Sequence, residues 1–206
     1  LFYLSGIEQE ESILILFPDA SNPKHREVLF LREPSEHLKI WEGYKHSKED
    51  AQKISGIETV YWTKDFDDTF QLLAMEAEVF FLNENEHSRA ANEVETRDKR
   101  FNAGIRNQYP LHKIDRLAPH LHGLRFCKKS EEIKLIKQAI DVTTRGFRKV
   151  LRMVKPGVAE YEVEAEWAKE FIRRRSKFAY TPIVASGENA CVLHYLQNDQ
   201  ICKKGD

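Results

Sequence analysis

The chain has 206 residues, 41% of them hydrophobic, and its 32 Lys and Arg are offset by 33 Asp and Glu. The net charge of −1 excludes a protein whose overall field attracts nucleic acid or an anionic membrane, and the length allows one domain or one and a half. No apolar run approaches the ~20 residues of a membrane span, and no signal peptide is recognisable. The three cysteines lack CxxC spacing, so we expect free thiols in a reducing cytoplasm and neither a disulfide framework nor a zinc site.

The first half of the chain alternates short apolar runs with amphipathic stretches. Four runs predict strands, at residues 13–17, 28–31, 60–62 and 79–82. The first of these is continuous and stops at Pro18-Asp19, which is typical of a strand covered on both faces. Phe66, Phe70, Leu73 and Ala77 recur at helical spacing before the fourth strand. The order β-β-α-β-α-β predicts an α/β domain with a mixed sheet, which we place at residues 1–118.

The middle of the chain has weaker signals. Residues 84–96 are polar and predict a loop, whereas residues 97–109 predict a helix that ends at Pro110. No clean period runs through residues 111–126, so we expect an irregular connection, with the crossover between two domains at residues 119–129. Three histidines in this part (His112, His120 and His122) are predicted to be solvated linker residues and not metal ligands.

The pattern changes at Ser130, which we expect to cap a long helix with Glu131 and Glu132 in its first turn. Apolar residues then mark one face of that helix: Ile133, Ile136, Ile140, Phe147, Val150 and Val154. The turn Lys155-Pro156-Gly157 ends it, and a second amphipathic helix is predicted over residues 159–175. The three arginines at residues 173–175 are expected to complement the negative end of this helix, not to form a nucleic-acid patch.

Residues 181–195 predict a hairpin in which Gly187 turns the chain with a positive φ. Its second strand, residues 190–193, is expected to be buried and to place His194 at its end. A lone histidine in this position is either a hydrogen-bonded structural residue or a functional one, and the residues alone leave both possibilities open.

Several segments resemble the aminopeptidase P branch of the creatinase/prolidase family. The main one contains Lys155-Pro156-Gly157, then Pro-Ile-Val-Ala-Ser-Gly-Glu-Asn-Ala-Cys-Val-Leu-His-Tyr over 182–195, then Lys204-Gly205-Asp206. Upstream, residues 2–6, 40–43 and 126–133 are similar to further segments of the same family, so the resemblance covers nearly the whole chain. It implies a ribonuclease-H-like α/β domain followed by an α+β pita-bread catalytic domain. Residues 130–206 would be the first, incomplete part of that second domain.

The resemblance also implies an activity, which is hydrolysis of the bond between an N-terminal residue and a following proline. Family members use two divalent metals, commonly manganese, held by two Asp, one His and two Glu. All five ligands are expected after residue 206, and Asp206 itself is assigned to a turn. We therefore expect no metal ligand in residues 1–206 and no activity from this chain alone. The apolar faces of its two long helices are expected to be exposed, so that copies of the chain exchange segments unless the whole protein supplies further strands to cover them.

Two residues are matched to site positions of the family. His194 matches a substrate-side histidine that is not a metal ligand, and an imidazole N–H there would stabilise negative charge on the carbonyl oxygen. Tyr195 is expected to pack and to fix the histidine. Trp41 matches a tryptophan that reaches a neighbouring subunit's active site, although tryptophan is also a common packing residue. The resemblance thus implies a cytoplasmic homo-oligomer, a dimer or tetramer, that binds peptides with proline at the second position and neither nucleic acid nor membrane.

Two alternatives stay open at this point. The pita-bread scaffold also serves non-enzymatic peptide- or histone-binding proteins, because a fold does not fix a function. His194 favours the enzyme, since a binding-only relative has no chemical need for it. Within the enzymes, a prolidase (an Xaa-Pro dipeptidase) is not distinguished from an aminopeptidase by these residues.

Overall fold

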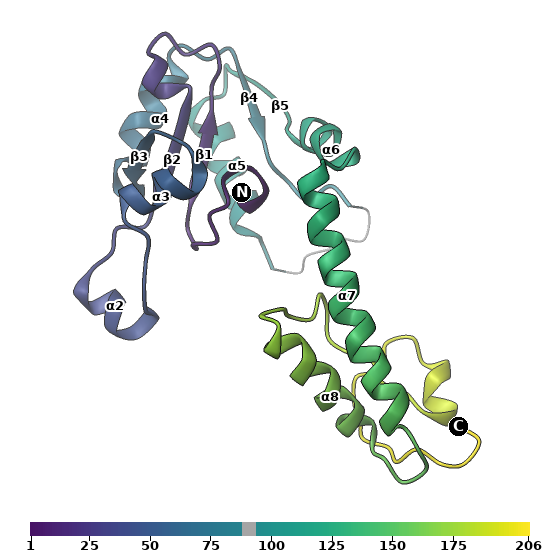
Figure 1. The fold of residues 1–206 in the computed structure, drawn as a ribbon. Helices are drawn as coiled ribbons and strands as arrows, with labels where there is room; N and C mark the ends of the chain where they lie inside the picture. Colours follow the sequence, from purple (N-terminus) through teal and green to yellow (C-terminus); the bar gives the residue numbers. More distant parts are fainter. Residues whose placement is uncertain (88–93) are drawn as a thin grey trace. The chain divides into compact units, whose positions relative to one another are not determined.

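The computed structural model describes residues 1–87 and 94–206, which form two compact units, Leu1–His122 and Gly123–Asp206. Unit 1 contains a three-stranded sheet of β1 (Ile13–Leu16), β2 (Glu27–Leu31) and β3 (Thr59–Trp62) (Figure 1). β2 is central, antiparallel to β1 and parallel to β3. The prediction of a mixed sheet within an α/β unit is confirmed.

The core of unit 1 forms on both faces of β2. Val28 and Phe30 pack with Phe66 on one face, while Leu29 and Leu31 pack with Ile7 on the other. These four apolar side chains of β2 are fully buried, as an uninterrupted apolar run between two layers requires. β1, by contrast, is an edge strand whose Leu16 is 52% exposed. Ile13 and Ile15 nevertheless pack on one core cluster and Leu14 on the other, so the prediction that residues 13–17 are covered on both faces holds for residues 13–15 and fails at Leu16.

Five helices accompany this sheet in the described part of unit 1, besides α6 at its boundary: α1 (Phe2–Ser5), α2 (Glu36–Glu42), α3 (Lys48–Ser55), α4 (Phe66–Ala74) and α5 (Arg97–Gln108). Two short 3₁₀ turns also occur, η1 (Pro23–His25) and η2 (Thr63–Asp65). Hydroxyl caps fix several helix starts, as at α5, where the Thr96 hydroxyl accepts a hydrogen bond from the Lys99 N–H at 3.2 Å. The predicted helix over residues 97–109 is confirmed. The predicted loop at 84–96 lies partly outside the described residues.

The stretch expected to be an irregular connection has regular structure. β4 (Val79–Leu82) pairs in parallel with β5 (Lys113–Arg116), and α6 (Ala118–Phe126) follows directly. His112 is not a solvated linker residue, because its ring stacks on Phe80 at 4.6 Å and its Nε2 lies 2.9 Å from the carbonyl oxygen of Ala74. His120 meets the ring of Phe81 edge-on at 4.9 Å, but both His120 and His122 are exposed. The charged residues of β5 hid this strand, since only Ile114 gives an apolar signal there.

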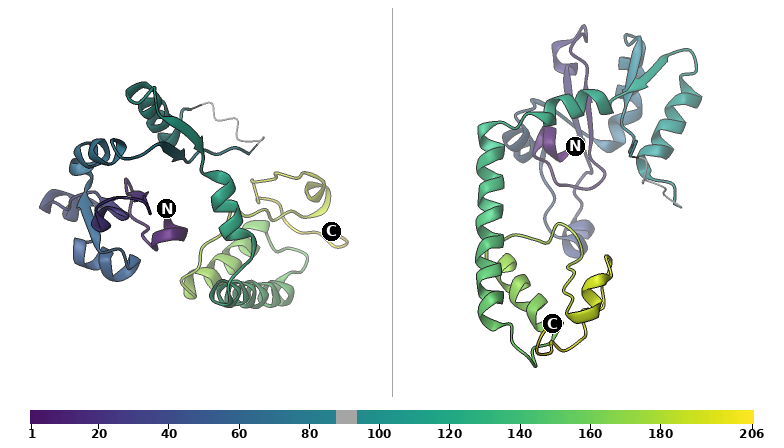
Figure 2. Two further views of the ribbon diagram at one scale, coloured as in Figure 1. Left: turned by 90° about the horizontal axis from the view of Figure 1, so that it is seen from above. Right: turned by 90° about the vertical axis from the view of Figure 1, so that its right-hand side faces the viewer.

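Unit 2 is built on two helices that lie side by side, α7 (Ser130–Met153) and α8 (Glu160–Arg173) (Figures 1 and 2). Both predicted helices are confirmed, although Ser130 is the first helical residue of α7 and Lys129 is its N-cap. Val150 of α7 packs against Val163 of α8, and the rings of Phe147 and Trp167 meet edge-on. Several other apolar residues of α7 stay 42–59% exposed, namely Ile133, Ile136 and Ile140. Much of the predicted apolar face of α7 is therefore uncovered.

The predicted hairpin at residues 181–195 is wrong. The described chain there forms a short 3₁₀ helix, η3 (Gly187–Cys191), between irregular segments, and Gly187 does have a positive φ of 52°. A strand needs a neighbour to complete its ladder of hydrogen bonds, and none of the described segments pairs with residues 190–193. The apolar side chains of Val192 and Leu193 are accordingly 52% and 87% exposed.

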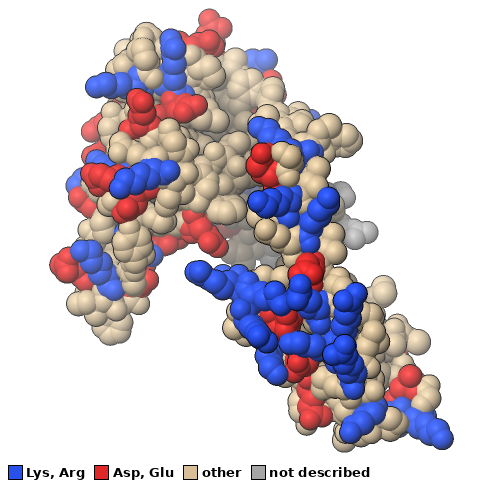
Figure 3. Space-filling model, in the orientation of Figure 1, with Lys and Arg blue, Asp and Glu red and all other residues tan. Residues whose placement is uncertain are grey.

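Charge is divided unequally between the two units. Unit 1 contains 15 Lys and Arg against 22 Asp and Glu, whereas unit 2 contains 17 against 11. Figure 3 shows Lys and Arg gathered on one face of unit 2. Among the described residues, no helix combines the length and the apolar character that crossing a bilayer requires.

Candidate functional site

His194 lies in the segment that wraps around the start of α8. The residues on either side of it differ sharply in burial, because Leu193 is 87% exposed and Tyr195 is only 7% exposed. His194 itself is exposed. The structure thus corrects the expectation that a buried strand delivers this histidine. It is instead an exposed residue next to a buried anchor.

That anchor is organised by one carboxylate, the side chain of Glu160 in the first turn of α8. Glu160 is fully buried. Its Oε1 accepts hydrogen bonds from the Ser186 N–H at 2.7 Å and the Ser186 hydroxyl at 2.8 Å. Its Oε2 accepts from the Tyr195 hydroxyl at 2.6 Å and the Gln200 N–H at 3.0 Å. Three points of the chain around His194, at residues 186, 195 and 200, therefore meet at one side chain.

The same hydrogen bonds decide the charge of this cluster. Burial raises the pKa of Glu160, but the bonds from Tyr195, Ser186 and Gln200 outweigh burial and lower the pKa to about 2. Burial and the hydrogen bond to Glu160 raise the pKa of Tyr195 to about 12. At neutral pH the cluster therefore consists of a buried carboxylate and a neutral phenol that donates to it.

A second anchor is the buried side chain of Asn198. Its Oδ1 accepts from the Val184 N–H at 3.0 Å, and its Nδ2 donates to Glu164 at 2.8 Å and to the carbonyl oxygen of Pro182 at 3.1 Å. Asn198 has a φ of 48°, a left-handed conformation that asparagine tolerates better than most residues. The segments before and after His194 are thus tied both to each other and to α8.

Backbone pairing continues this attachment toward the end of the chain. Residues Ala159 and Ile201 form an antiparallel bridge, and the Glu160 N–H donates to the Gln200 carbonyl oxygen at 2.9 Å. The Cys202 N–H donates to the Val158 carbonyl oxygen at 2.8 Å. Further on, the Lys203 N–H donates to the Asp206 carboxylate at 2.6 Å within a turn.

The chemistry open to this site follows from which groups are already engaged. Ser186, Tyr195 and Glu160 spend their polar atoms on each other, so none of them is placed to act as a nucleophile or general base. The exposed imidazole of His194 is the group in this segment that can present a ring N–H to a bound molecule. The site as described offers one hydrogen-bond donor on an anchored loop.

The second predicted site residue, Trp41, belongs to unit 1. Trp41 lies on α2 and is 75% exposed, beside Ile40, which is 78% exposed. Buried Gln9 fixes both ends of the segment that carries α2, because its Nε2 donates to the Arg32 carbonyl oxygen at 3.3 Å and its Oε1 accepts from the His46 N–H at 2.8 Å. Trp41 is therefore not a core residue of unit 1, and packing within this unit does not explain it.

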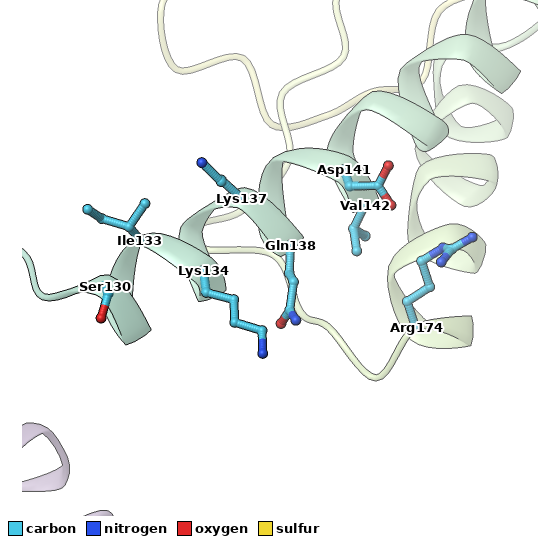
Figure 4. Close-up of a pocket in the computed structure, with 8 residues that line it drawn as sticks. All are labelled: Ser130, Ile133, Lys134, Lys137, Gln138, Asp141, Val142 and Arg174. Carbon is cyan, nitrogen blue, oxygen red and sulfur yellow. The ribbon is translucent and has the colours of Figure 1, made fainter.

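Unit 2 also contains a hollow that His194 does not line. It has a volume of about 740 Å³ and lies along the first half of α7 beside Arg174 (Figure 4). Its lining combines the aliphatic Ile133 with Lys134 and Lys137. Neither His194 nor Trp41 lines this hollow, so we assign it no part in the candidate site.

Proteins hold metal ions with clusters of His, Cys, Asp and Glu side chains. Among residues 1–87 and 94–206, no group of three His, Cys, Asp or Glu lies close enough to hold a metal ion. The carboxylates that are buried in unit 2 are committed to other partners, Glu160 to the loop and Glu170 to Lys149 and Arg174. Within residues 1–87 and 94–206, the side chains therefore do not form a metal centre of their own.

Two protein families match this chain, one near its start and one near its end. Residues 1–81 match the family described as the aminopeptidase P N-terminal domain, and residues 134–206 match metallopeptidase family M24. The chain is therefore similar to aminopeptidase P proteins over most of its length, with a segment like their N-terminal domain followed by a segment like family M24.

Individual relatives make the similarity more specific. The Xaa-Pro aminopeptidase of Escherichia coli is 27% identical to this chain, over 100% of this chain and 47% of its own length. Human Xaa-Pro aminopeptidase 3 is 26% identical, over 99% of this chain and 40% of its own length. Among solved structures, a Bacillus anthracis protein assigned as an aminopeptidase P has a TM-score of 0.87 at 33% identity, covering 100% of this chain and 49% of its own. A zinc-substituted E. coli aminopeptidase P in complex with product has a TM-score of 0.79 at 26% identity, covering 100% and 47%. The chain spans about half the length of the curated relatives it matches.

Sequence reasoning missed the residues that build the loop, above all Glu160 and Asn198. In the sequence, Glu160 looks like an ordinary acidic residue in the first turn of a helix, where the dipole favours it. Its burial depends on contacts 26 to 40 residues away in the chain, which no local pattern reveals. A left-handed asparagine such as Asn198 also has no signal in the surrounding residues.

Proposed function

We propose that the intact protein to which this chain belongs is an Xaa-Pro aminopeptidase, which releases an N-terminal residue that precedes proline. The observation that carries this is the similarity of the whole chain to Xaa-Pro aminopeptidases, with both family matches in the same order along the chain. A binding-only protein and a prolidase are not favoured by any of these relatives.

Within that reaction, His194 is proposed to bind the substrate and act as a catalytic residue. Attack on the peptide carbonyl group places negative charge on its oxygen, and a fixed imidazole N–H beside that oxygen stabilises the charge. The exposed ring on an anchored loop supports this role, because a donor that is already in place needs no reorganisation during the reaction. Tyr195 is proposed to fix this loop and not to touch the substrate.

The intact protein is further proposed to hold two divalent metal ions, with manganese as the expected metal. Family M24 is a metallopeptidase family, and one solved neighbour is a zinc-substituted enzyme. Since no group of described residues fits a metal, we propose that the ligands are supplied outside residues 1–206 and that this chain alone is inactive.

Trp41 is proposed to contact the substrate in the active site of a neighbouring subunit, so that the working enzyme is a homo-oligomer, a dimer or tetramer. A large aromatic side chain that is 75% exposed at a firmly attached helix supports this role.

The arrangement into domains is also part of the proposal. We assign a ribonuclease-H-like domain to residues 1–118, a crossover to 119–129 and the first part of a pita-bread domain to 130–206, in a cytoplasmic enzyme. The helices α7 and α8 and the anchored loop would then form one edge of that second domain.

The direct test is to assay the intact protein, loaded with manganese, on pairs of peptides that differ only in having proline or alanine at the second position. We expect release of the N-terminal residue from the proline peptide only. Cleavage of neither peptide would refute the proposal. A matched dipeptide and tripeptide series separates the two enzyme classes, because a prolidase acts on the dipeptide alone.

A further inference from the structure

Glu160 is a buried, ionised group that the proposed mechanism does not use. We propose that Glu160 is a positioning residue, whose carboxylate holds the segment around His194 so that the imidazole meets the substrate in one orientation. This inference rests on the proposed function, because it assigns a role in that same reaction.

Burying the charged side chain of Glu160 costs free energy. A carboxylate that is fully removed from water loses strong hydration, and here its four hydrogen-bond donors are all uncharged. Replacing buried charges by well-packed apolar residues is often neutral or stabilising, so stability alone is a weak reason for such a group. Glu170, which is buried on the same helix, is different because the cations of Lys149 and Arg174 compensate it, and Lys149 also connects α8 to α7.

The four hydrogen bonds of Glu160 reach the chain on both sides of His194. Glu160 leaves from α8, a helix of 14 residues, and contacts the chain at Ser186, before His194, and at Tyr195 and Gln200, after it. Tyr195 is the direct neighbour of His194, so its fixed ring restricts the backbone from which the imidazole projects. The backbone of the exposed His194 is thereby held in place by its buried neighbour.

The test uses the intact enzyme and four proteins: wild type, Glu160→Gln, His194→Ala and the double variant. In Glu160→Gln the amide NH₂ must face either the Ser186 pair or the Tyr195–Gln200 pair, so part of the anchor is lost. Since misplacing a catalytic group by about 1 Å can cost ~10²-fold in rate, we expect kcat to fall roughly 10- to 100-fold with little change in KM. On the His194→Ala background, the same change should have almost no further effect on kcat.

Two further variants keep the test decisive. Tyr195→Phe removes one of the four donors and retains the ring, so it should give a smaller loss of kcat that also disappears without His194. It replaces Glu160→Gln if that variant does not fold. Glu162→Gln is the matched control, because Glu162 caps the same helix turn by accepting from the Ala159 N–H at 2.8 Å, and it should leave kcat unchanged.

The outcomes separate the two claims. If the wild type cleaves Xaa-Pro peptides while Glu160→Gln and Tyr195→Phe match it in kcat, the positioning role is wrong and the proposed function stands. Losses of equal size with and without His194 also overturn it, because they indicate a general structural effect. A wild type that cleaves no Xaa-Pro peptide overturns the proposed function and this inference together.

Discussion

At the scale of single residues, unit 2 depends on two buried carboxylates with opposite surroundings. Glu160 is held by neutral donors, whereas Glu170 is held by Arg174 at 2.6 Å and by Lys149. The hydrogen bonds from Arg174 and Lys149 lower the pKa of Glu170 to about 2, the same value that Glu160 reaches. Both groups thus stay charged in the folded protein far below the pH at which they would protonate in an unfolded chain.

These pKa values predict how stability depends on pH. Because the folded pKa of each group lies below the ordinary value of 4.5, the stabilisation is fully present above about pH 4.5. It is lost progressively as the pH falls toward 2. We expect the difference in Tm between wild type and Glu170→Gln to be largest at neutral pH and to shrink between pH 4.5 and 2. A difference that stays constant over this range would contradict the assignment, and Glu166→Gln, whose partner Lys169 is exposed, is the control.

At the scale of elements, the spacing of apolar residues predicted the strands and helices whose formation depends on local periodicity. The strands at 28–31, 60–62 and 79–82 and the helices α7 and α8 follow from spacing alone. β5 was missed because Lys113, Asp115 and Arg116 leave a single apolar side chain to mark it. The hairpin was predicted wrongly because the apolar residues Val192 and Leu193 were expected to be buried. Their segment is instead set by the bonds to Glu160 and Asn198, which depend on residues distant in the chain.

The turn at η3 gives a prediction at this scale. Gly187 has a φ of 52°, and a Cβ added there would lie 3.1 Å from the Asp206 carboxylate. A left-handed conformation costs a residue with a Cβ about 1–2 kcal/mol, so Gly187→Ala should lower the free energy of unfolding by that amount. Denaturant titration measures this. Gly123→Ala is the matched control, because Gly123 lies within α6 with open space around it and should be neutral or slightly stabilising.

At the scale of the whole molecule, the uncovered face of α7 and the exposed Trp41 are features that a larger assembly would explain. Ile136 and Ile140 are 47% and 59% exposed on one face of a 24-residue helix. We expect the isolated 24.1 kDa chain to associate in sedimentation experiments and to release no residue from Xaa-Pro peptides. A monomer that turns over such peptides with manganese would contradict both expectations.

Trp41 gives a separate prediction for the assembled enzyme. If its side chain completes a neighbouring subunit's substrate site, Trp41→Ala should raise KM about tenfold, a loss of ~1.4 kcal/mol, and leave Tm unchanged. Met75→Ala is the control, because Met75 is an apolar side chain of unit 1 that is 83% exposed. An unchanged KM would show that Trp41 does not contact the substrate.

The most direct test of the central claim is the kcat of His194→Ala in the intact, manganese-loaded protein on an Xaa-Pro peptide. Loss of one hydrogen-bond donor to a developing oxyanion typically lowers kcat by roughly 10²–10³, so we expect a decrease of that size with an unchanged Tm. A variant that cleaves the peptide as fast as the wild type would contradict the role assigned to His194.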